Sequence, residues 1–491
     1  MYDSVMLLLM LILPACAGGL AALARSVKAA FTIMILGIFF AAFCAAGIVY
    51  AVYTETTVTA VGSWLYADAL SSYHLVVMNA VFLLSTIFAT VYFQRETGEH
   101  VLSLKQAKTF TALWCSSYSS MALVLVSNNL GIMWVGIEAT TLLTAFLICI
   151  NKTRPSLEAM WKYLIICSVG VAFAFMGTLL AAASTQHITG LEGHHALLWT
   201  SLKEHASQLD PLFMKAAFIF LVVGYGTKAG LAPMHTWLPD AHSQAPAPVS
   251  AMFSGFMLNA ALYCIMRYIP LTEAATGNCG WSLSFLTLLG LISIGIGAAF
   301  VVFQNDIKRL LAYCSVEHIG IIALGLGFGG IGVFAALFHT FNHALAKTVS
   351  FSAAGRLGQI YGSHDIRNMQ GTYARSRTWG IGLFSGLLAL IGVVPFALFM
   401  SEFQIIKASV DAHATVRMVL FLAGIAVVFI SMLRKAIMLF YGTSATREKV
   451  RSTLTEKVLV IIPIAVLLVA GLWMPHFFAA MISRAAAIIG Y

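Results

Sequence analysis

The feature that most constrains this fold is a series of long apolar runs that recurs along the whole chain. A helix of about 20 apolar residues crosses the roughly 30 Å hydrocarbon core of a bilayer, and about fourteen runs approach that length. The chain has 491 residues, 60% hydrophobic and 10% charged, whereas soluble domains carry about 25% charged residues. We therefore predict an all-α polytopic membrane protein with about fourteen transmembrane helices. The runs lie near 4–24, 29–53, 71–93, 108–126, 130–150, 160–183, 212–232, 247–270, 282–303, 309–327, 330–354, 378–410, 416–441 and 455–483.

The connections between these runs alternate in charge. Counted in order, the odd-numbered connections are basic except for the seventh (233–246), whereas the second, fourth and tenth contain no Lys or Arg. Because basic loops stay on the cytoplasmic side, an even number of crossings places both termini on the non-cytoplasmic side of a prokaryotic inner membrane. The first run has no basic residue before it, which favours a spanning helix over a cleaved signal peptide. The basic connections contain Arg25 and Lys28; Arg95, Lys105 and Lys108; Lys152, Arg154 and Lys162; Lys308 and Arg309; Arg356, Arg367, Arg375 and Arg377; and Arg447, Lys449, Arg451 and Lys457, while Lys203, Lys215, Lys407 and Arg417 are exceptions.

Composition also limits the partners and cofactors that we expect. The net charge of +9 follows the membrane topology, so it does not indicate nucleic acid as a partner; membrane lipid is the expected surrounding. Eight cysteines are scattered without a CxxC pair, and iron–sulfur or metal sites need closely grouped thiolates. We expect no cofactor and no metal. The polar segment 184–211 contains four histidines, whose spacing fits no standard ligand template, and a solvated loop is favoured over a metal site.

Two apolar segments carry helix-breaking residues at their centres. Segment 212–246 contains Gly230 and Pro233, and segment 378–410 contains Gly392 and Pro395. Paired broken helices at corresponding positions of two halves are typical of inverted-repeat transporters whose sites lie near the membrane midplane. Sequence similarity between the two halves is weak, so this repeat is inferred from the pattern of interruptions.

Ionisable residues lie inside these apolar segments. Lys228 lies in FLVVGYGTKAGLAP and Glu138 in LGIMWVGIEATTLL. A charge at membrane depth costs several kcal/mol unless it is compensated, and such residues usually mark an ion pathway. We expect Glu138 and Lys228 to form an ion pair that also acts as a switch, because moving the carboxylate away would favour release of the lysine proton. A purely structural salt bridge is the alternative.

A second polar group lies in the run LFHTFNHALAKTVSF. His339, His343 and Lys347 are spaced at i, i+4 and i+8, so they share one face of a helix and cover about 12 Å of its length. Two imidazoles and an amine in line can relay protons. Hydrogen bonding to neighbouring helices is the structural alternative. His318, which follows Glu317 in NDIKRLLAYCSVEHIG, extends this path or belongs to a structural network, and Glu402 follows the second interruption.

These motifs resemble those of the antiporter-like, proton-translocating membrane subunits of respiratory complex I, Mrp antiporters and membrane-bound hydrogenases. The resemblance covers nearly the whole chain and is strongest over 127–405. It rests on GYGTKAGLAPMHTWLPDAHSQAPAPVSA, NDIKRLLAYCSVEHIG and FHTFNHALAK, while WVGIEATTLLTAFLI looks closest to component F of hydrogenase-4 or formate hydrogenlyase.

The resemblance implies a specific set of residues and repeats. It assigns the proton path to Glu138, Lys228, Lys347 with His339 and His343, and Glu402, with a bridging basic residue between the two lysines. Here Asn259 occupies that bridging position, and asparagine does not carry a proton at neutral pH. The family also implies two inverted five-helix repeats, each with one broken helix. We place N-terminal helices at 1–107, the repeats at 108–270 and 282–441, and a C-terminal transmembrane helix at 455–491.

The predicted function is proton translocation within an energy-converting redox complex, and Na⁺/H⁺ exchange is left open as the ion specificity. The chain itself would be non-catalytic, and its partners would be membrane and peripheral subunits of hydrogenase-like or quinone-reductase-like type. The alternatives are a subunit of an Mrp-type Na⁺/H⁺ antiporter and a membrane subunit for inorganic-carbon uptake. A purely structural scaffold is the least favoured, because it would not retain costly buried charges.

Overall fold

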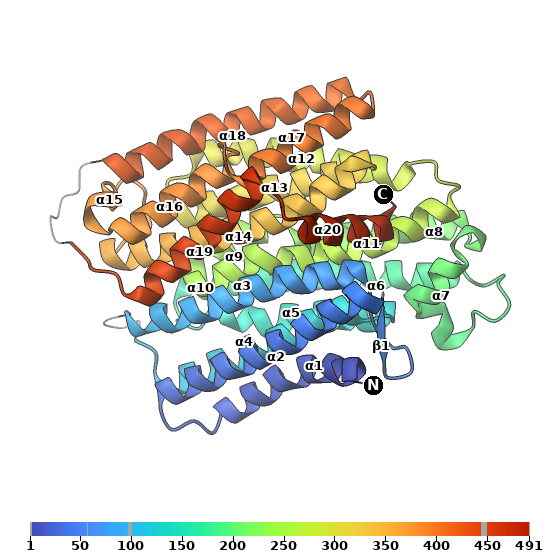
Figure 1. Cartoon of the computed structure of the whole chain (residues 1–491), viewed down its shortest axis with the longest axis horizontal. Coiled ribbons are helices and arrows are strands. Elements are labelled where there is room, and N and C mark those ends of the chain that lie inside the picture. Colours follow the sequence, from blue (N-terminus) through green and yellow to red (C-terminus); the bar gives the residue numbers. More distant parts are fainter. Residues whose placement is uncertain (1, 56, 97–100, 443–448, 491) are drawn as a thin grey trace.

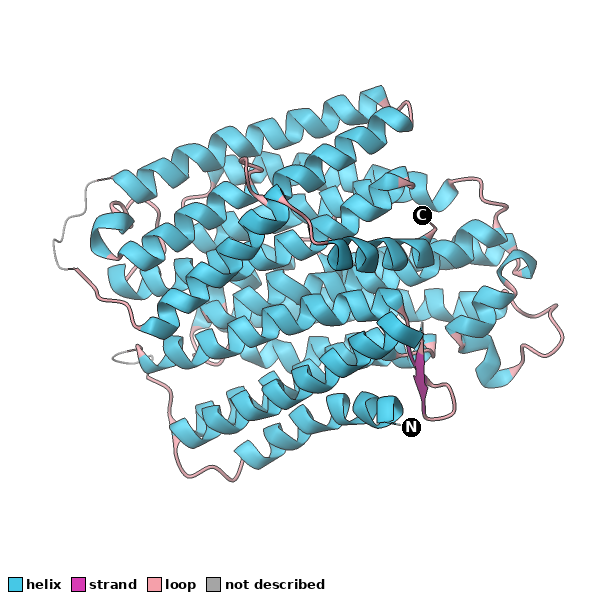
Figure 2. Ribbon diagram, in the orientation of Figure 1, coloured by secondary structure: helices cyan, strands magenta, loops and turns pink. Residues whose placement is uncertain are grey.

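The chain folds into a bundle of long helices that run roughly side by side, with one small hairpin at one end (Figures 1 and 2). The computed structural model describes residues 2–55, 57–96, 101–442 and 449–490. The first half contains α1 (Tyr2–Ala21), α2 (Val27–Glu55), β1 (Val58–Ala60), β2 (Leu65–Ala67), α3 (Ala69–Gln94), α4 (Leu104–Val126), α5 (Leu130–Ile148), α6 (Arg154–Ala183), η2 (Gly193–Leu197), α7 (Trp199–Glu204), η3 (Ala206–Gln208), α8 (Pro211–Ala229) and α9 (Trp237–Gln244). The second half contains α10 (Ala247–Met252), η4 (Phe253–Met257), α11 (Leu258–Ala275), α12 (Trp281–Phe303), α13 (Ile307–Phe328), α14 (Ile331–Tyr361), α15 (Thr372–Arg375), α16 (Arg377–Leu390), α17 (Ala397–Asp411), α18 (Thr415–Tyr441), α19 (Leu454–Leu472) and α20 (His476–Ile489).

The all-α polytopic class predicted from the sequence is confirmed. Within the described ranges, 12 helical segments are long and apolar enough to span a membrane. Helices are the form that a membrane favours, because each backbone N–H and C=O is satisfied within the segment. The other two predicted crossings fall on α14, whose polar stripe lowers its hydropathy, and on α16 with α17, which are each too short alone. The count of fourteen crossings therefore stays a prediction.

Polar caps fix where several of these helices begin. Asp68 accepts hydrogen bonds from the backbone N–H groups of Leu70 and Ser71 at the start of α3. Ser103, Thr153 and Thr453 form capping boxes at α4, α6 and α19. Such caps satisfy backbone donors that the first helical turn leaves free.

Both predicted interruptions are present. Helix α8 ends at Ala229 and is capped by Gly230, which has a positive φ of 82°, and α9 begins at Trp237 after a stretch without helix. Helix α16 ends before Gly392, which has a φ of 67°, and α17 begins at Ala397. Glycine adopts these left-handed conformations without the cost that a Cβ atom brings. The run predicted near 455–483 is also divided, into α19 and α20, with Pro475 just before α20.

Burial separates a central group of helices from the periphery. Within 18-residue stretches of 247–275 and of α13 every residue is buried, whereas only 17% of the residues in the corresponding stretch of α18 are buried. Helix α14 is buried along most of its length and contacts α13, α16 and α17. The π-helical turn η4 interrupts the buried segment between α10 and α11, and such turns often occur at functional positions. The centre of the bundle is therefore formed by α10, α11, α13 and α14.

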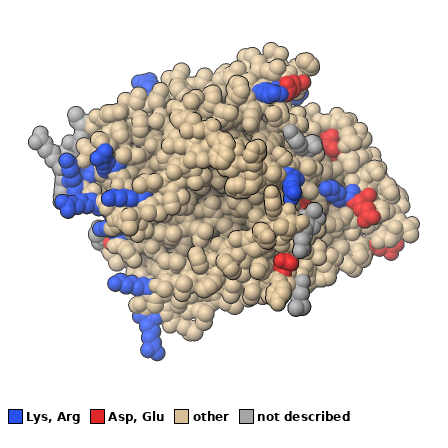
Figure 3. All heavy atoms as spheres, viewed as in Figure 1, with Lys and Arg blue, Asp and Glu red and all other residues tan. Residues whose placement is uncertain are grey.

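The two ends of the bundle differ in charge. Lys and Arg gather at the end that contains α15, and Asp and Glu are more frequent at the opposite end, beside α7 (Figure 3). The end near α7 also carries the β1–β2 hairpin, the 184–210 loop, the start of α1 and the end of α20 (Figure 1). Ser4 of α1 donates a hydrogen bond to the Thr59 carbonyl there, at 2.8 Å.

Candidate functional site

Lys228 lies at the first helix break, in the last turn of α8, and is completely buried. Its Nζ atom donates a hydrogen bond to Thr141 Oγ1 at 2.9 Å and another to the Tyr163 hydroxyl. It also lies 4.7 Å from the centre of the Tyr163 ring. The lysine is thus held by neutral oxygens from α5 and α6.

Glu138 lies on α5, one turn before Thr141, and is half-buried. Its Oε1 atom accepts a hydrogen bond from Ser168 Oγ of α6 at 3.0 Å, while Oε2 has no hydrogen-bond partner among the described residues. No ion pair within 4.0 Å joins Glu138 to Lys228 in this part of the chain. The predicted direct pair is therefore wrong for this structure, because two hydroxyl groups occupy the position next to the ammonium.

Tyr163 connects Lys228 to the centre of the bundle, and sequence reasoning missed it. Its hydroxyl lies 2.6 Å from Thr144 Oγ1 and 3.6 Å from Met257 Sδ in η4. The Thr144 hydroxyl donates to the Thr140 carbonyl at 2.6 Å, so the Tyr163 hydroxyl is left to donate to Thr144 while it accepts from Lys228. A single tyrosine in an apolar helix carries no charge signal, so only the fold reveals this contact.

The predicted histidines meet at the interface of α13, α14 and α17. His318 Nδ1 lies 2.9 Å from His339 Nε2, and His339 Nδ1 lies 2.9 Å from Ser401 Oγ. The His343 ring lies beside them at a tilt of 41°, with its centre 5.0 Å from that of His318. All three histidines are fully buried, so the sequence prediction that they form one polar group agrees with their placement.

The hydrogen bonds set the direction of this chain of imidazoles. Ser401 donates its hydroxyl to the Leu398 carbonyl at 2.8 Å, so it accepts from His339 Nδ1–H. His339 Nε2 then accepts from His318 Nδ1–H, which leaves His318 Nε2 without a proton. That atom is buried and has no partner among the described residues. A proton that binds there can move on through His339 toward Ser401.

Lys347 and Glu402 complete the second half of the site. Lys347 is fully buried on α14 and donates to the Leu311 carbonyl of α13 at 2.7 Å. Glu402 is buried on α17, beside the second helix break, where a Cβ atom on Gly392 would lie 2.4 Å from Glu402 Oε2. Glu317 and Glu402 both line a cavity of about 450 Å³. Both carboxyl groups therefore border a cavity beside the second helix break.

The bridging position contains Asn259, as the sequence requires, directly after η4. Its Nδ2 donates to the Gly255 carbonyl at 2.9 Å, and its Oδ1 has no partner within the described ranges. A second buried group, which sequence reasoning missed, is His242 of α9, packed between the Phe253 and Phe351 rings. Both His242 ring nitrogens lack hydrogen-bond partners in the described chain. Its place in the DAHSQAP motif was the available signal.

Potential metal ligands form two buried groups in the described residues. One contains His318, His339 and Glu402, and the other contains Cys314, Glu317 and His318. The histidines of the 184–210 loop belong to neither group. In the first group the two imidazoles already share a hydrogen bond, which occupies one nitrogen of each ring.

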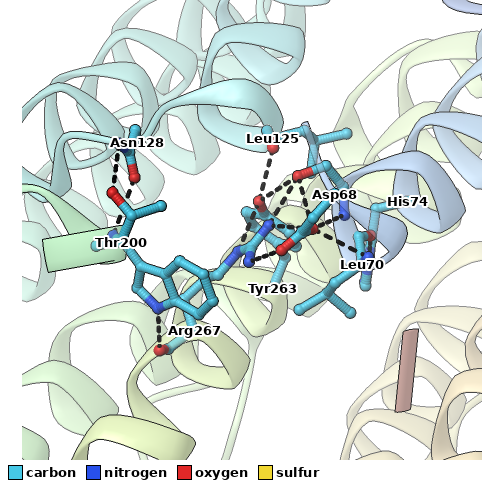
Figure 4. A network of polar contacts seen from close by, with 10 residues as sticks. Asp68, Leu70, His74, Leu125, Asn128, Thr200, Tyr263 and Arg267 are labelled. Carbon is cyan, nitrogen blue, oxygen red and sulfur yellow. Dashed lines mark hydrogen bonds and ion pairs between the residues drawn. The ribbon is translucent and has the colours of Figure 1, made fainter. Parts of the chain in front are cut away.

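A further polar network, also missed from the sequence, joins α3 to α11 (Figure 4). Arg267 of α11 forms a bidentate ion pair with Asp68, at 2.6 and 2.7 Å, and donates through Nε to the Tyr263 hydroxyl at 2.9 Å. Burial alone would raise the pKa of Asp68, but the Arg267 guanidinium outweighs it and holds this pKa below its usual range. Because Arg267 and Asp68 lie far apart in the sequence, nothing in the sequence indicates that they form an ion pair.

Comparison with known proteins identifies the family of this chain. Residues 127–429 match the transmembrane family described as NADH:quinone oxidoreductase/Mrp antiporter. The chain belongs to this family. It is 39% identical over 349 residues to a hydrogenase-4 component F homolog from Methylacidiphilum infernorum, an alignment that covers 71% of this chain and 73% of that protein. The resemblance to hydrogenase-4 component F that the sequence predicted is confirmed.

Solved structures share the fold of this NADH:quinone oxidoreductase/Mrp antiporter family member. A chain of the archaeal membrane-bound sulfane sulfur reductase superposes with a TM-score of 0.88 at 24% identity, covering 99% of this chain and 97% of that one. A chain of respiratory complex I from Thermus thermophilus superposes with a TM-score of 0.82 at 18% identity, covering 99% and 100%. At these identities the likeness establishes the polytopic fold alone.

Proposed function

We propose that this chain is the proton-translocating membrane subunit of an energy-converting redox complex of the hydrogenase-4 or formate hydrogenlyase type. The observation that carries this proposal is the set of fully buried Lys228, His318, His339 and Lys347 in the core helices. Placing charge at membrane depth costs several kcal/mol, which a purely structural scaffold does not require. The similarity to a hydrogenase-4 component F homolog supports the type of complex.

The proposed path runs from the first broken helix to the second. Lys228 exchanges a proton with the Tyr163 hydroxyl, and Glu138 biases this step by its charge from the next turn of α5. His242 and Asn259 lie between the two halves of the path. Lys347 and the hydrogen-bonded imidazoles of His318 and His339, with His343 beside them, carry the proton on, and Glu402 is the last group before the cavity.

The topology and partners follow from the same proposal. The basic end with α15 faces the cytoplasm, by the positive-inside rule, and both termini lie on the non-cytoplasmic side of a prokaryotic inner membrane. We place inverted repeats at 108–270 and 282–441, flanked by 1–107 and by the helices of 455–491. Partner subunits of hydrogenase-like or quinone-reductase-like type supply the redox chemistry, and lipid surrounds the outer helices.

Replacing Lys228 tests the proposal directly. In Lys228→Ala, redox-driven proton uptake into inverted membrane vesicles falls at least about a hundredfold, the range of a lost acid–base group. The amount of assembled complex stays close to that of the unchanged protein, because alanine removes the ammonium without adding bulk. Full proton uptake by this variant contradicts the proposal.

The Mrp-type antiporter alternative makes a different prediction. A redox subunit co-purifies with iron–sulfur or hydrogenase partners and moves no protons without them. An antiporter subunit produces a Na⁺-dependent pH change in liposomes that contain no redox partner. Purification under mild detergent followed by both assays separates the two functions.

A further inference from the structure

The Asp68–Arg267 network lies at the end of the bundle with the hairpin and the 184–210 loop, away from the helix breaks. Helix α11 connects it to the bridging position, because Asn259, Tyr263 and Arg267 are spaced at i, i+4 and i+8 and share one face. Eight residues of helix correspond to about 12 Å. This face therefore leads from the centre of the bundle to its hairpin end.

His74 lies beside this face and has an unused proton site. Its Nδ1 atom is 2.9 Å from the Leu70 carbonyl, which only accepts hydrogen bonds, so Nδ1 carries the proton. In the neutral ring Nε2 is then a bare acceptor. The side chain is fully buried and Nε2 has no partner among the described residues. The His74 ring packs against the Tyr263 ring, with centres 5.0 Å apart (Figure 4).

The ion pair next to His74 is fully satisfied. Asp68 accepts from Arg267, from Ser71 Oγ at 3.3 Å and from two backbone N–H groups. The pair carries no net charge, so a positive charge on His74 faces a balanced neighbourhood. Without the Asp68 carboxylate, Arg267 would oppose that charge in a medium of low dielectric constant.

The 184–210 loop covers the network from outside. The Trp199 ring lies 4.5 Å from the Arg267 guanidinium carbon, and its indole N–H donates to the Arg267 carbonyl at 2.8 Å. The Asn128 side chain, at the start of α5, holds the neighbouring Thr200 by two hydrogen bonds (Figure 4). The network therefore lies directly beneath α7 at the hairpin end, where Lys203 also lies over the Trp199 ring, 4.8 Å from its centre.

We propose that His74, supported by the Asp68–Arg267 pair, is the outlet of the proton path at the hairpin end, reached along the Asn259–Tyr263–Arg267 face of α11. This inference rests on the proposed function. A proton from the centre forms an N–H bond at His74 Nε2, giving an imidazolium, while Nδ1–H stays bonded to Leu70. The same Nε2–H bond then breaks and the proton passes to water at the hairpin end, which restores the neutral ring.

Three single variants, assayed for redox-driven proton uptake by the whole complex in vesicles, test the outlet. His74→Gln keeps a polar side chain that cannot carry a proton, and we expect uptake to fall at least about tenfold. The matched control is His205→Gln in the 184–210 loop, whose Nδ1 makes the same contact with the carbonyl four residues earlier, Ser201, at 3.0 Å. This control keeps full uptake, and Lys228→Ala loses it.

The outcomes separate the outlet from the proposed function. Normal uptake by His74→Gln together with loss in Lys228→Ala overturns the outlet alone. Normal uptake by both overturns the proposed function as well.

A charge-balancing pair of variants covers the case in which His74→Gln does not assemble. Asp68→Asn keeps a side-chain oxygen that can cap α3 but leaves Arg267 unbalanced, so we expect uptake to fall at least about tenfold. Asp68→Asn with Arg267→Gln carries no net charge and regains at least about half of the original uptake, since the opposing charge is gone. A double variant no better than Asp68→Asn alone assigns the pair a purely structural role and overturns the proposal.

Discussion

Buried lysines in this bundle are held by neutral oxygen atoms. Lys228 donates to hydroxyl groups, Lys347 donates to the Leu311 carbonyl, and Lys308 donates to the Ser243 carbonyl at 2.9 Å. An ammonium group without a bound carboxylate has no fixed counter-charge, so a charge that moves nearby has a large effect on whether it keeps its proton. This arrangement favours a role for these lysines in proton transfer over a role in static ion pairs.

Removing one hydroxyl group tests the step next to Lys228. In Tyr163→Phe the ring remains, with its contacts to Trp237 and Phe253, so the complex assembles normally. Lys228 loses its link to Thr144, and proton uptake in vesicles falls at least about tenfold.

The matched control for this change is Tyr225→Phe on α8. Tyr225 is also fully buried, but its hydroxyl has no hydrogen-bond partner among the described residues. We expect the Tyr225→Phe variant to keep full proton uptake. Equal rates for the two variants would mean that the Tyr163 hydroxyl takes no part in the transfer.

At the scale of elements, the two helix breaks bring irregular backbone to membrane depth. Backbone of this kind is tolerated only where protein buries it or where it lines a cavity. Here Lys228 lies in the last turn of α8, before the first break, and Glu402 lies in the second turn of α17, after the second break. The breaks therefore place the charged groups in the interior, where the neighbouring helices surround them.

The second break allows a specific test with Gly392→Ala. The new Cβ atom would lie 2.4 Å from Glu402 Oε2, at a φ of 67° that favours glycine. Backbone strain of this kind costs about 1–3 kcal/mol, so the melting temperature in detergent decreases and the displaced carboxylate lowers proton uptake. Gly295→Ala on α12, where nothing lies within 4 Å of the added atom, leaves both quantities unchanged. If Gly392→Ala changes neither the melting temperature nor proton uptake, the position of Glu402 is not fixed by this contact.

At the scale of the whole molecule, an apolar core that contains buried titratable side chains lies between two differently charged ends. The core helices contain the titratable residues, while α18 and α19 expose apolar side chains such as Ile430 and Ile461. Lys and Arg gather at the end with α15 (Figure 3). A bilayer accommodates this distribution, with the apolar surface in lipid and the charges at the two faces.

A natural cysteine tests the proposed orientation. Cys279 is exposed in the turn between α11 and α12, at the hairpin end, whereas the other described cysteines are buried or, like Cys16, lie on a spanning helix. A membrane-impermeant maleimide added to intact cells labels Cys279, and Cys279→Ser abolishes the label. In that background Arg367→Cys, at an exposed position of the loop before α15, is labelled only after the membrane is opened. The reverse labelling pattern would mean that the protein has the opposite orientation in the membrane.

Much of the site was accessible from the sequence because its residues are anomalous. Lys228, Lys347 and Glu402 stand out as charges in apolar runs, and His339 and His343 share their helical spacing. The direct Glu138–Lys228 pair was predicted by charge complementarity, which says nothing of the hydroxyl groups that compete for the same ammonium. Residue roles along the path remain predictions until the variants are measured.

The sequence by itself determined the polytopic helical class, the breaks near Gly230 and Gly392, and the family, since apolar length, glycine and proline positions and motifs are local properties. Only the tertiary structure decided which polar atoms meet. Tyr163 beside Lys228, His318 beside His339, and Asp68 with Arg267 join residues 65, 21 and 199 positions apart. Hydrogen bonds act over about 3 Å, so such partners depend on how the helices pack.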